Sequence, residues 1–467
     1  MPPLLALLLC TAFVGWMLRF DRRLSPLVSP VAWLPTLWLF SVTTKPLVHW
    51  LGASSGDAWS SPWDQRFQIS LLVWGLIVLV RRSFDWPAAI RNQPWPFLLL
   101  GFMLISCFWA DLTFVTFKRW GRQFVAIVMA LVVLSENNPR QTVESLLRRF
   151  AYILLPFSIV LIKYFPHYGI EFHRWSGGRM WVGVATQKNG LGIVCFIALL
   201  FLLWTVFRRW QRRDQSVNRL HAGGEGVILF IGLYMLFLPE GKNSATSIAA
   251  FLLGIGTILV LGWLRYRRTQ LRRPLLTFSV LALIGVGIGL PLSGKGLGDK
   301  LGGAMGRDAT LTGRADTWAE MVPQAMKRPV LGCGFESYWT PDTRELHRMS
   351  NAHNAYLEIF NELGGLGLLL FALFWLSVAQ AAWQASMEDA DWGALAISYL
   401  LIILLHGVSE SSINAFTSQL GSILLLLLVS CTGLVRRAAS LASDDQVLPF
   451  PSQRPAPAPA FNGGSAT

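Results

Sequence analysis

The sequence has few charged residues for its length. Asp, Glu, Lys and Arg make up 14% of the 467 residues, against about 25% in ordinary soluble domains. Hydrophobic residues reach 53%, and the mean hydropathy is +0.47. So much apolar surface must face lipid, which excludes a soluble globular enzyme. We therefore predict an all-α polytopic membrane protein.

The sequence also lacks the common motifs for disulfides, metals and nucleotides. Four of the five cysteines lie in apolar runs and only Cys333 lies in a polar segment, so neither a disulfide framework nor a CxxC metal site is expected. There is no P-loop, so ATP is not the expected energy source. Divalent metal ions prefer paired carboxylates, and the Asp-x-Asp sequence at 389–391 lies in a predicted cytoplasmic loop and not on the outer face. We therefore expect no metal, and we expect no other cofactor.

Apolar stretches recur along the whole chain and predict about 12–13 transmembrane helices. We expect the first stretch to be a retained span, because no basic segment precedes it. The candidate spans are 1–18, 24–44, 67–80, 92–110, 123–135, 150–166, 190–207, 226–239, 245–264, 275–292, 363–384, 392–408 and 414–435.

Basic clusters fall in alternate loops of this scheme, at 22–23, 81–82, 148–149, 208–213, 265–273 and 436–437. The positive-inside rule places these loops in the cytoplasm. The excess of 40 Lys and Arg over 26 Asp and Glu is therefore assigned to cytoplasmic loops, and no nucleic-acid partner is expected. The segments 45–66, 111–122, 167–189, 240–244, 293–358 and 406–413 are then predicted to lie outside.

Four regions follow from this scheme. Residues 1–292 form ten helices with short loops, and 293–358 form a long periplasmic loop that carries short helices. Residues 359–437 form the C-terminal transmembrane helices. The tail at 438–467 is rich in Pro and Ala and is predicted to be a disordered cytoplasmic segment.

The long outer loop holds an unusual number of cations, among them Arg307 and Arg314. They are either ordinary solvated loop residues or the contacts of an anion. Arg314 stands apart because Thr-Gly-Arg predicts a glycine turn immediately before a helix at 315–327, which Pro323 breaks. Backbone N–H groups at a helix start favour anions. Arg119, Arg179 and Lys188 add cations in two shorter outer segments.

His353 precedes a predicted helix that runs into the span starting near Leu363. Helical spacing places Asn354, Glu358 and Glu362 on one face, as a polar stripe at the membrane surface. A lone loop histidine is commonly a solvent-exposed or capping residue. A histidine with a carboxylate partner at such a surface is instead suited to deprotonating a hydroxyl group.

These motifs together resemble the bacterial O-antigen ligase and polymerase superfamily. They are 187–192 (Gln-Lys-Asn-Gly-Leu-Gly), 244–247, 312–314, 329–335 (Pro-Val-Leu-Gly-Cys-Gly-Phe), 353–357 (His-Asn-Ala-Tyr-Leu) and 362–367, in the same order as in the family. The sequence Gly-Arg-Asp-x-Thr-Leu-Thr-Gly-Arg at 306–314 is most similar to the exopolysaccharide polymerase branch.

The resemblance implies a helical, glycosyltransferase-C-like membrane enzyme of the bacterial inner membrane whose site faces the periplasm. The implied donor is an oligosaccharide on undecaprenyl diphosphate, and the implied reaction is inverting and metal-independent. By the same resemblance, His353 corresponds to the base, Arg314 to the diphosphate contact, and Lys188 or Arg179 to a further anion contact. The other candidate contacts of the substrate or its diphosphate are Arg307, Arg119, Asn354 and Glu358.

Three functions remain open on these grounds. The first is a polymerase that joins lipid-linked repeat units, with membrane lipids and a chain-length regulator as partners. The second is a ligase that transfers the glycan to lipid A-core or to protein. The third is a transporter, for which charges along a transmembrane path are expected, whereas the charges here lie at the ends of the predicted spans.

Overall fold

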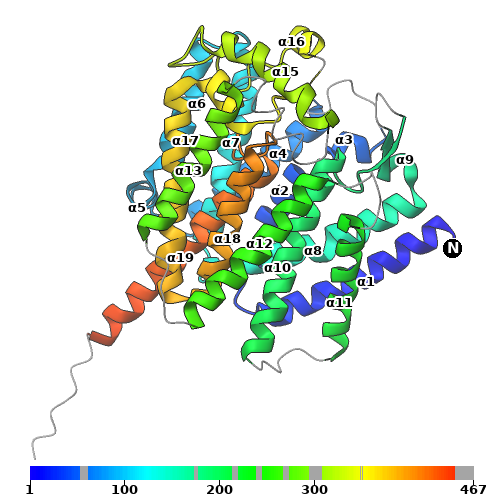
Figure 1. Ribbon diagram of the computed structural model, residues 1–467. Coiled ribbons are helices and arrows are strands. Elements are labelled where there is room, and N and C mark those ends of the chain that lie inside the picture. Colours follow the sequence, from blue (N-terminus) through cyan, green and yellow to red (C-terminus); the bar gives the residue numbers. More distant parts are fainter. Residues whose placement is uncertain are drawn as a thin grey trace, which may run out of the picture.

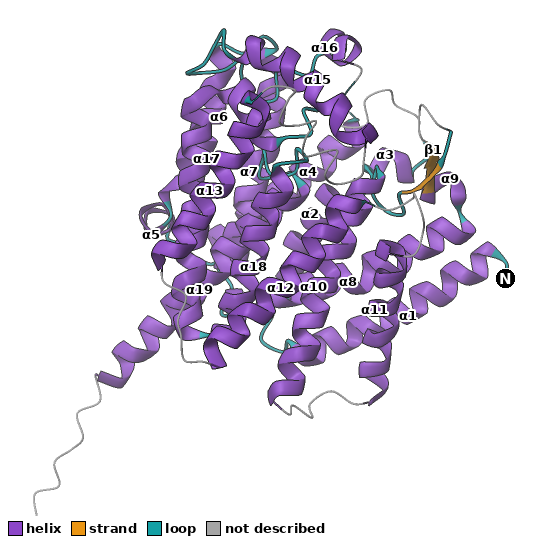
Figure 2. Cartoon of the chain, viewed as in Figure 1, coloured by secondary structure: helices purple, strands orange, loops and turns teal. Residues whose placement is uncertain are grey.

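The computed structural model describes residues 1–52, 61–172, 177–212, 219–237, 244–266, 273–293, 308–347, 349 and 351–446. Nearly all of this part of the chain is helical, as Figure 2 shows. The exception with strand structure is a short antiparallel hairpin, β1 (Ile170–Phe172) and β2 (Arg179–Trp181), in which Ile170 pairs with Trp181. The predicted all-α polytopic class is confirmed.

The helices of the first half of the chain are α1 (Pro3–Leu24), η1 (Pro30–Ala32), α2 (Trp33–Thr43), α3 (Leu47–Trp50), α4 (Pro62–Arg81), α5 (Trp86–Asn92), α6 (Pro94–Ile105), η3 (Ser106–Phe108), α7 (Thr113–Leu134), α8 (Pro139–Tyr164), α9 (Pro166–Gly169) and α10 (Lys188–Arg212). The second half contains α11 (Arg219–Phe237), α12 (Ala245–Tyr266), α13 (Arg273–Leu292), α15 (Asp308–Ala325), α16 (Pro341–His347), α17 (Ala355–Glu388), α18 (Ala390–Gly407) and α19 (Gln419–Gln446).

Each of the predicted spans overlaps at least one of these helices, but the helices are not all long enough to cross a membrane. Among the described residues, 10 helices are long and apolar enough to cross a membrane, while the stretches at 30–43 and 94–108 are shorter apolar helices. The helix α7 falls in neither group, and its first half carries Lys118, Arg119 and Arg122. Three of the predicted crossings therefore rest on short or charged helices.

The helices differ in how far they are enclosed by their neighbours. Most residues of α8, α10, α18 and α19 are buried inside the protein, whereas most residues of α1, α4, α12 and α13 are partly buried or exposed. Exposed side chains such as Leu8, Trp74, Leu259 and Phe278 form the outer surface of these peripheral helices. The first group thus forms the centre of a bundle, and the second forms a surface suited to lipid (Figure 1).

The segments that connect the helices lie at two opposite ends of the bundle, and polar contacts join the segments at each end. At one end, Lys45 N donates to Val184 O at 2.8 Å, and Asp111 N donates to Cys333 O at 3.4 Å. The short helices α15 and α16 lie over this end, at the top of Figure 1.

At the opposite end, ion pairs join Arg148 to Asp21 at 2.9 Å, Arg82 to Glu136 at 2.7 Å and Arg265 to Asp391 at 2.7 Å. The grouping of the loops into two sets agrees with the alternation predicted from the basic clusters. We call the end that carries α15 and α16 the loop end, and the other the arginine end.

Three local predictions were wrong. The helix α15 begins at Asp308, so Gly313 and Arg314 lie inside it and form no turn before it, and Pro323 is accommodated within the helix without ending it. The tail does not leave the helical state at 438, because α19 continues to Gln446. Hydropathy marks where a span leaves the apolar region, but a helix can extend beyond it.

Candidate active site

The Pro-Val-Leu-Gly-Cys-Gly-Phe segment packs against a kink in α17. Cys333 N donates to Asn361 O at 3.1 Å and Gly334 N to Glu362 O at 2.8 Å, while Gly365 N donates back to Pro329 O at 2.7 Å. At the kink Gly364 has a φ of 64°, and a Cβ there would lie 2.2 Å from Val330 O. Only glycine fits this conformation and this close backbone approach. Two motifs that are separate in sequence therefore form one interlocked unit.

His353 lies immediately before the first turn of α17, as predicted. Its φ is 47°, a left-handed conformation that is uncommon for a residue other than glycine. His353 N donates to Asn351 Oδ1 at 3.0 Å, which holds the backbone in this conformation. The side chain is 23% exposed. The ring is thus fixed by the backbone yet still reachable from solvent.

The carboxylate partner of His353 is Glu410, which follows α18. His353 Nδ1 lies 2.9 Å from Glu410 Oε2, and Asn189 Nδ2 donates to Glu410 Oε1 at 2.8 Å. Glu410 is almost completely buried. Within the described part of the chain, Nε2 of His353 has no hydrogen-bond partner. A carboxylate on Nδ1 fixes the tautomer that leaves the Nε2 lone pair free to accept a proton.

The predicted polar stripe on α17 faces the protein interior. Asn354 caps the helix by accepting from Leu357 N at 2.8 Å, and its amide donates to Gly287 O and Val408 O, each at 3.0 Å. Glu358 is also buried and accepts from Trp339 Nε1 at 3.1 Å and from Ala352 N at 3.2 Å. The side chains of Asn354 and Glu358 are therefore engaged in holding the chain around His353.

A second histidine–carboxylate pair occurs in the same loop. His347 Nδ1 lies 2.9 Å from Glu320 Oε2, and Tyr338 Oη lies 2.8 Å from His347 Nε2. The His347 side chain is fully buried, and both ring nitrogens are occupied. This ring has no nitrogen available to a substrate, so His347 is an internal control for His353.

The predicted cations lie in different surroundings. Arg119 forms an ion pair with Glu336, with Nε 3.4 Å from Oε2, and also donates to the backbone oxygen of Glu336. Lys188 is half-buried at the start of α10, next to Asn189, and Arg179 is exposed on β2. Arg307 lies outside the described residues. The backbone of Arg314 belongs to α15, but its side chain is not among the described side chains.

The thiol of Cys333 is not suited to act as a nucleophile. Burial, together with the nearby Glu362 carboxylate, raises the pKa of Cys333 to about 12. A thiol with such a pKa is almost entirely protonated at neutral pH.

Among the described residues there is no group of three His, Cys, Asp or Glu side chains that could hold a metal ion.

A buried lysine supports the segment that leads to Lys188. Lys45 Nζ donates to Gly183 O at 3.0 Å and to Ala185 O, and Lys45 is 9% exposed. Desolvation lowers the pKa of Lys45 to about 8, an effect opposed by Glu171. Lys45 thus fixes the backbone just before α10, although no motif in the sequence points to it.

The sequence indicated the region of Glu410 but not its role. The segment 406–413 is predicted to lie outside with His353, but no motif identifies Glu410 as its carboxylate partner. Glu410 is 57 residues from His353 along the chain, so their contact depends on how α17 packs against α18. Asn189, Trp339 and Lys45 were missed for the same reason.

Parts of the chain are similar to known proteins. Residues 227–372 match the O-antigen ligase family. The exopolysaccharide production protein ExoQ of Rhizobium meliloti (strain 1021) is 26% identical over 331 residues, which cover 67% of this chain and 71% of ExoQ. The resemblance seen in the motifs, including that to the exopolysaccharide branch, is confirmed.

The match to the O-antigen ligase family includes Arg314, His353 and the kink at Gly364. Glu410, Asn189 and Lys188 lie outside the matched range. The contacts that join Glu410 to His353 and to Asn189 come from the structure and not from the comparison.

Proposed function

We propose that this protein is a glycosyltransferase that polymerises oligosaccharide repeat units carried on undecaprenyl diphosphate. The site is proposed to face the periplasm at the bacterial inner membrane. The similarity to ExoQ, whose name describes exopolysaccharide production, and to the O-antigen ligase family supports a role in polysaccharide biosynthesis. The polytopic fold suits a substrate anchored in lipid.

The observation that carries the proposal is the pair formed by His353 and Glu410. His353 is conformationally strained and half-buried, and presents a free Nε2 at the loop end. Strained residues held rigidly by their surroundings are typical of active sites. The buried carboxylate on Nδ1 stabilises the imidazolium that forms when Nε2 takes up a proton.

The proposed reaction is a single displacement at the anomeric carbon of the donor sugar. His353 Nε2 accepts the proton of an acceptor hydroxyl group as its oxygen bonds to the anomeric carbon. The bond between that carbon and the diphosphate oxygen breaks, and its electron pair leaves with the lipid diphosphate. Displacement on the face opposite the leaving group inverts the anomeric configuration. A positioned general base increases the rate of such a reaction by about 10²–10⁴-fold.

Cations of the protein are proposed to stabilise the departing diphosphate in place of a metal. We propose Lys188 for this role, since it begins α10 next to Asn189, the residue bonded to Glu410. The N–H groups at the start of α10 favour an anion in the same place. We propose Arg314 and Arg179 as further contacts, and one preorganised donor of this kind contributes roughly 2.7–4 kcal/mol.

The test is a reaction of purified protein with a defined undecaprenyl-diphosphate oligosaccharide in the presence of a chelator. Products are separated by size. We expect a ladder spaced by one repeat unit, and we expect His353→Ala to abolish it. His347→Ala serves as the matched control, because it removes the other histidine of the loop; we expect it to lower the unfolding temperature and leave the ladder. An intact ladder with His353→Ala would overturn the assignment of the base.

The second candidate is a ligase, which the similarity to the O-antigen ligase family favours. A ligase shares the donor, the base and the leaving group but uses a different acceptor. In the same assay it gives no ladder with the donor alone, and transfers the glycan once lipid A-core or another acceptor is added. The acceptor requirement therefore distinguishes the two candidates.

The sidedness has its own test. A periplasmic phosphatase reporter fused after residue 330 is expected to be active, and one fused after residue 270 inactive. Reversed activities would place the loop end in the cytoplasm and contradict the proposed face of the reaction.

A further inference from the structure

A cavity of about 810 Å³ lies at the arginine end of the bundle, far from His353. Its walls come from the last turns of α10 and α12, the end of α17 and the start of α18. Cavities of roughly 300–1,000 Å³ are typical of sites for small molecules. The proposed glycosyl transfer at the other end assigns no role to it.

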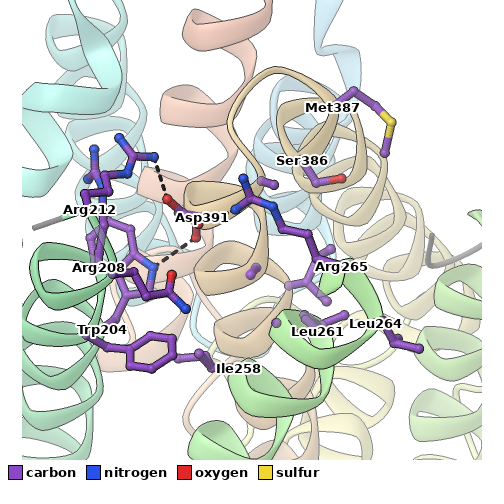
Figure 3. Close-up of a pocket in the computed structure, with 16 residues that line it drawn as sticks. Trp204, Arg208, Arg212, Ile258, Leu261, Leu264, Arg265, Ser386, Met387 and Asp391 are labelled. Carbon is purple, nitrogen blue, oxygen red and sulfur yellow. Dashed lines mark hydrogen bonds and ion pairs between the residues drawn. The ribbon is translucent and has the colours of Figure 1, made fainter. Parts of the chain in front are cut away.

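Two arginines face each other across this cavity. Arg212 Nη2 lies 2.5 Å from Asp391 Oδ2, and Arg265 Nη1 lies 2.7 Å from Asp391 Oδ1 (Figure 3). Their side chains are 51% and 62% exposed. Arg212 Nη2 also lies 4.0 Å from Asp389 Oδ1. A guanidinium group carries five N–H donors, so these contacts leave several donors of the two arginines for another anion. The two arginines can therefore receive a second anion between them.

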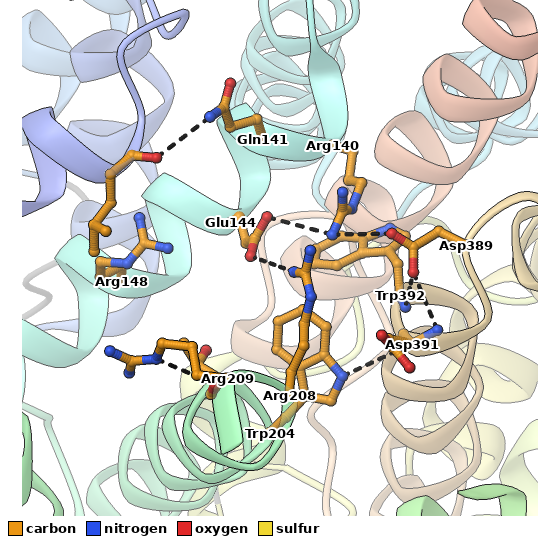
Figure 4. Close-up of polar contacts among 12 residues, drawn as sticks. Arg140, Gln141, Glu144, Arg148, Trp204, Arg208, Arg209, Asp389, Asp391 and Trp392 are labelled. Atoms are coloured by element: carbon orange, nitrogen blue, oxygen red, sulfur yellow. Dashed lines mark hydrogen bonds and ion pairs between the residues drawn. The ribbon is translucent and has the colours of Figure 1, made fainter. Parts of the chain in front are cut away.

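The third arginine of the cavity is held in place by a network of charges. Arg208 Nη1 donates to Glu144 Oε1 at 2.9 Å, and its guanidinium lies 5.1 Å from the centre of the Trp204 ring. Arg140 lies 3.2 Å from Asp389, beside the start of α18 (Figure 4). With three arginines and one aspartate, the residues lining the cavity keep an excess of positive charge.

The remaining wall of the cavity is largely apolar. Trp204 and Phe207 of α10 face Ile258 and Leu261 of α12 across it. The neighbouring α12 residue Trp263 is exposed on the surface that is suited to lipid. The charged opening of the cavity lies beside an apolar groove between two membrane helices. It is therefore complementary to an amphiphile with an anionic head group.

We propose that this cavity binds an anionic glycerophospholipid. Arg212 and Arg265 contact its phosphate group, and an acyl chain lies along the apolar wall between α10 and α12. The bound lipid ties the ends of α10, α12 and α18 together. This role is independent of the proposed glycosyl transfer and of which end of the bundle faces the cytoplasm.

The test is the shift in unfolding temperature of the full-length protein in detergent, measured during a titration with phosphatidylglycerol. A ligand that binds only the folded state raises this temperature. We expect a saturable rise with phosphatidylglycerol, and little change with phosphatidylcholine, which has no net charge. The double variant Arg212→Ala/Arg265→Ala is expected to bind phosphatidylglycerol about 30-fold more weakly, because two cations near an anionic headgroup are lost.

Two matched controls keep the test independent of effects on folding. Arg81→Ala/Arg91→Ala removes two exposed arginines elsewhere on α4 and α5, and is expected to respond like the wild type. A second test variant, Gly262→Phe, places a ring in the cavity, because Gly262 lines the cavity and has open space beside its Cα; all three arginines stay in place. Its control is Gly256→Phe, which adds the same ring at another open position of α12.

Loss of the response in Gly262→Phe and in the double arginine variant, with both controls unchanged, supports the site. An equal response in all variants overturns it. If inorganic phosphate alone raises the unfolding temperature as much as phosphatidylglycerol does, the cavity takes a soluble anion and the assignment to lipid is overturned.

Discussion

Glu410 joins two segments that meet at the loop end, because one of its oxygens lies 2.9 Å from His353 Nδ1 and the other accepts from Asn189 Nδ2 at 2.8 Å. His353 belongs to the start of α17 and Asn189 to the start of α10. One buried carboxylate therefore holds the proposed base next to the start of α10, the helix whose first residue is Lys188, the proposed diphosphate contact. In this arrangement Glu410 acts through His353 as a positioning residue.

The first prediction concerns this carboxylate. Glu410→Gln keeps the size of the side chain but removes the charge that stabilises the imidazolium, so we expect kcat to fall by roughly 10²–10⁴-fold with little change in KM for the donor. The measurement is the rate of ladder formation at varied donor concentration.

The matched control is Glu320→Gln, which alters the other histidine–carboxylate pair at the same Nδ1 distance of 2.9 Å. We expect it to leave kcat near the wild-type value. Equal losses in the two variants would show that Glu410 has no special link to the reaction.

The sequence predicted the helices, and the position of His353 directly before a helix, because both depend on local signals. A span is marked by a run of apolar residues, and His353 lies in a recognisable motif directly before a helix. The contacts of Glu410 with His353 and of Glu336 with Arg119 depend on packing between segments that are distant in the chain, 217 residues apart in the second case. The turn expected at Gly313 was wrong because glycine tolerates a helix interior at a modest cost.

The second prediction concerns the role of Arg119, which the sequence suggested as a diphosphate contact. Its partly buried ion pair with Glu336 gives it a structural role between α7 and the loop that follows α15. We expect Arg119→Ala and Glu336→Gln to lower the unfolding temperature, and the double variant to lower it by less than the sum of the two changes. We also expect the donor KM to be unchanged by Glu336→Gln. A normal unfolding temperature with a raised donor KM in Arg119→Ala would instead return Arg119 to the substrate site.

The third prediction tests the interlocked motifs. Gly364→Ala requires a left-handed alanine, which costs roughly 1–2 kcal/mol, and also places Cβ against the backbone oxygen of Val330. We expect a clear fall in unfolding temperature, and reduced activity, because α17 carries His353 at its start.

Gly365→Ala is the neighbouring control. Gly365 does not have a positive φ, and an added Cβ would lie 3.4 Å from Pro329 O, a contact that a small shift relieves. A similar loss of stability in both variants would mean that the conformation of Gly364 is not the cause.

The last prediction concerns pH. Burial lowers the pKa of Lys45 from 10.5 to about 8, so between these values the unfolded chain binds more protons at this position than the folded protein does. The free energy of unfolding therefore gains a contribution that rises with pH across this window. Lys45→Met cannot titrate, so we expect the wild type to gain stability relative to this variant between pH 8 and pH 10, as measured by thermal unfolding. Lys118→Met, at an exposed position of α7, is expected to follow the wild type. If Lys45→Met shows the same pH dependence as the wild type, the buried ammonium group of Lys45 is not the source of this pH dependence. The hydrogen bonds to Gly183 and Ala185 would then offset the cost of burying the charge.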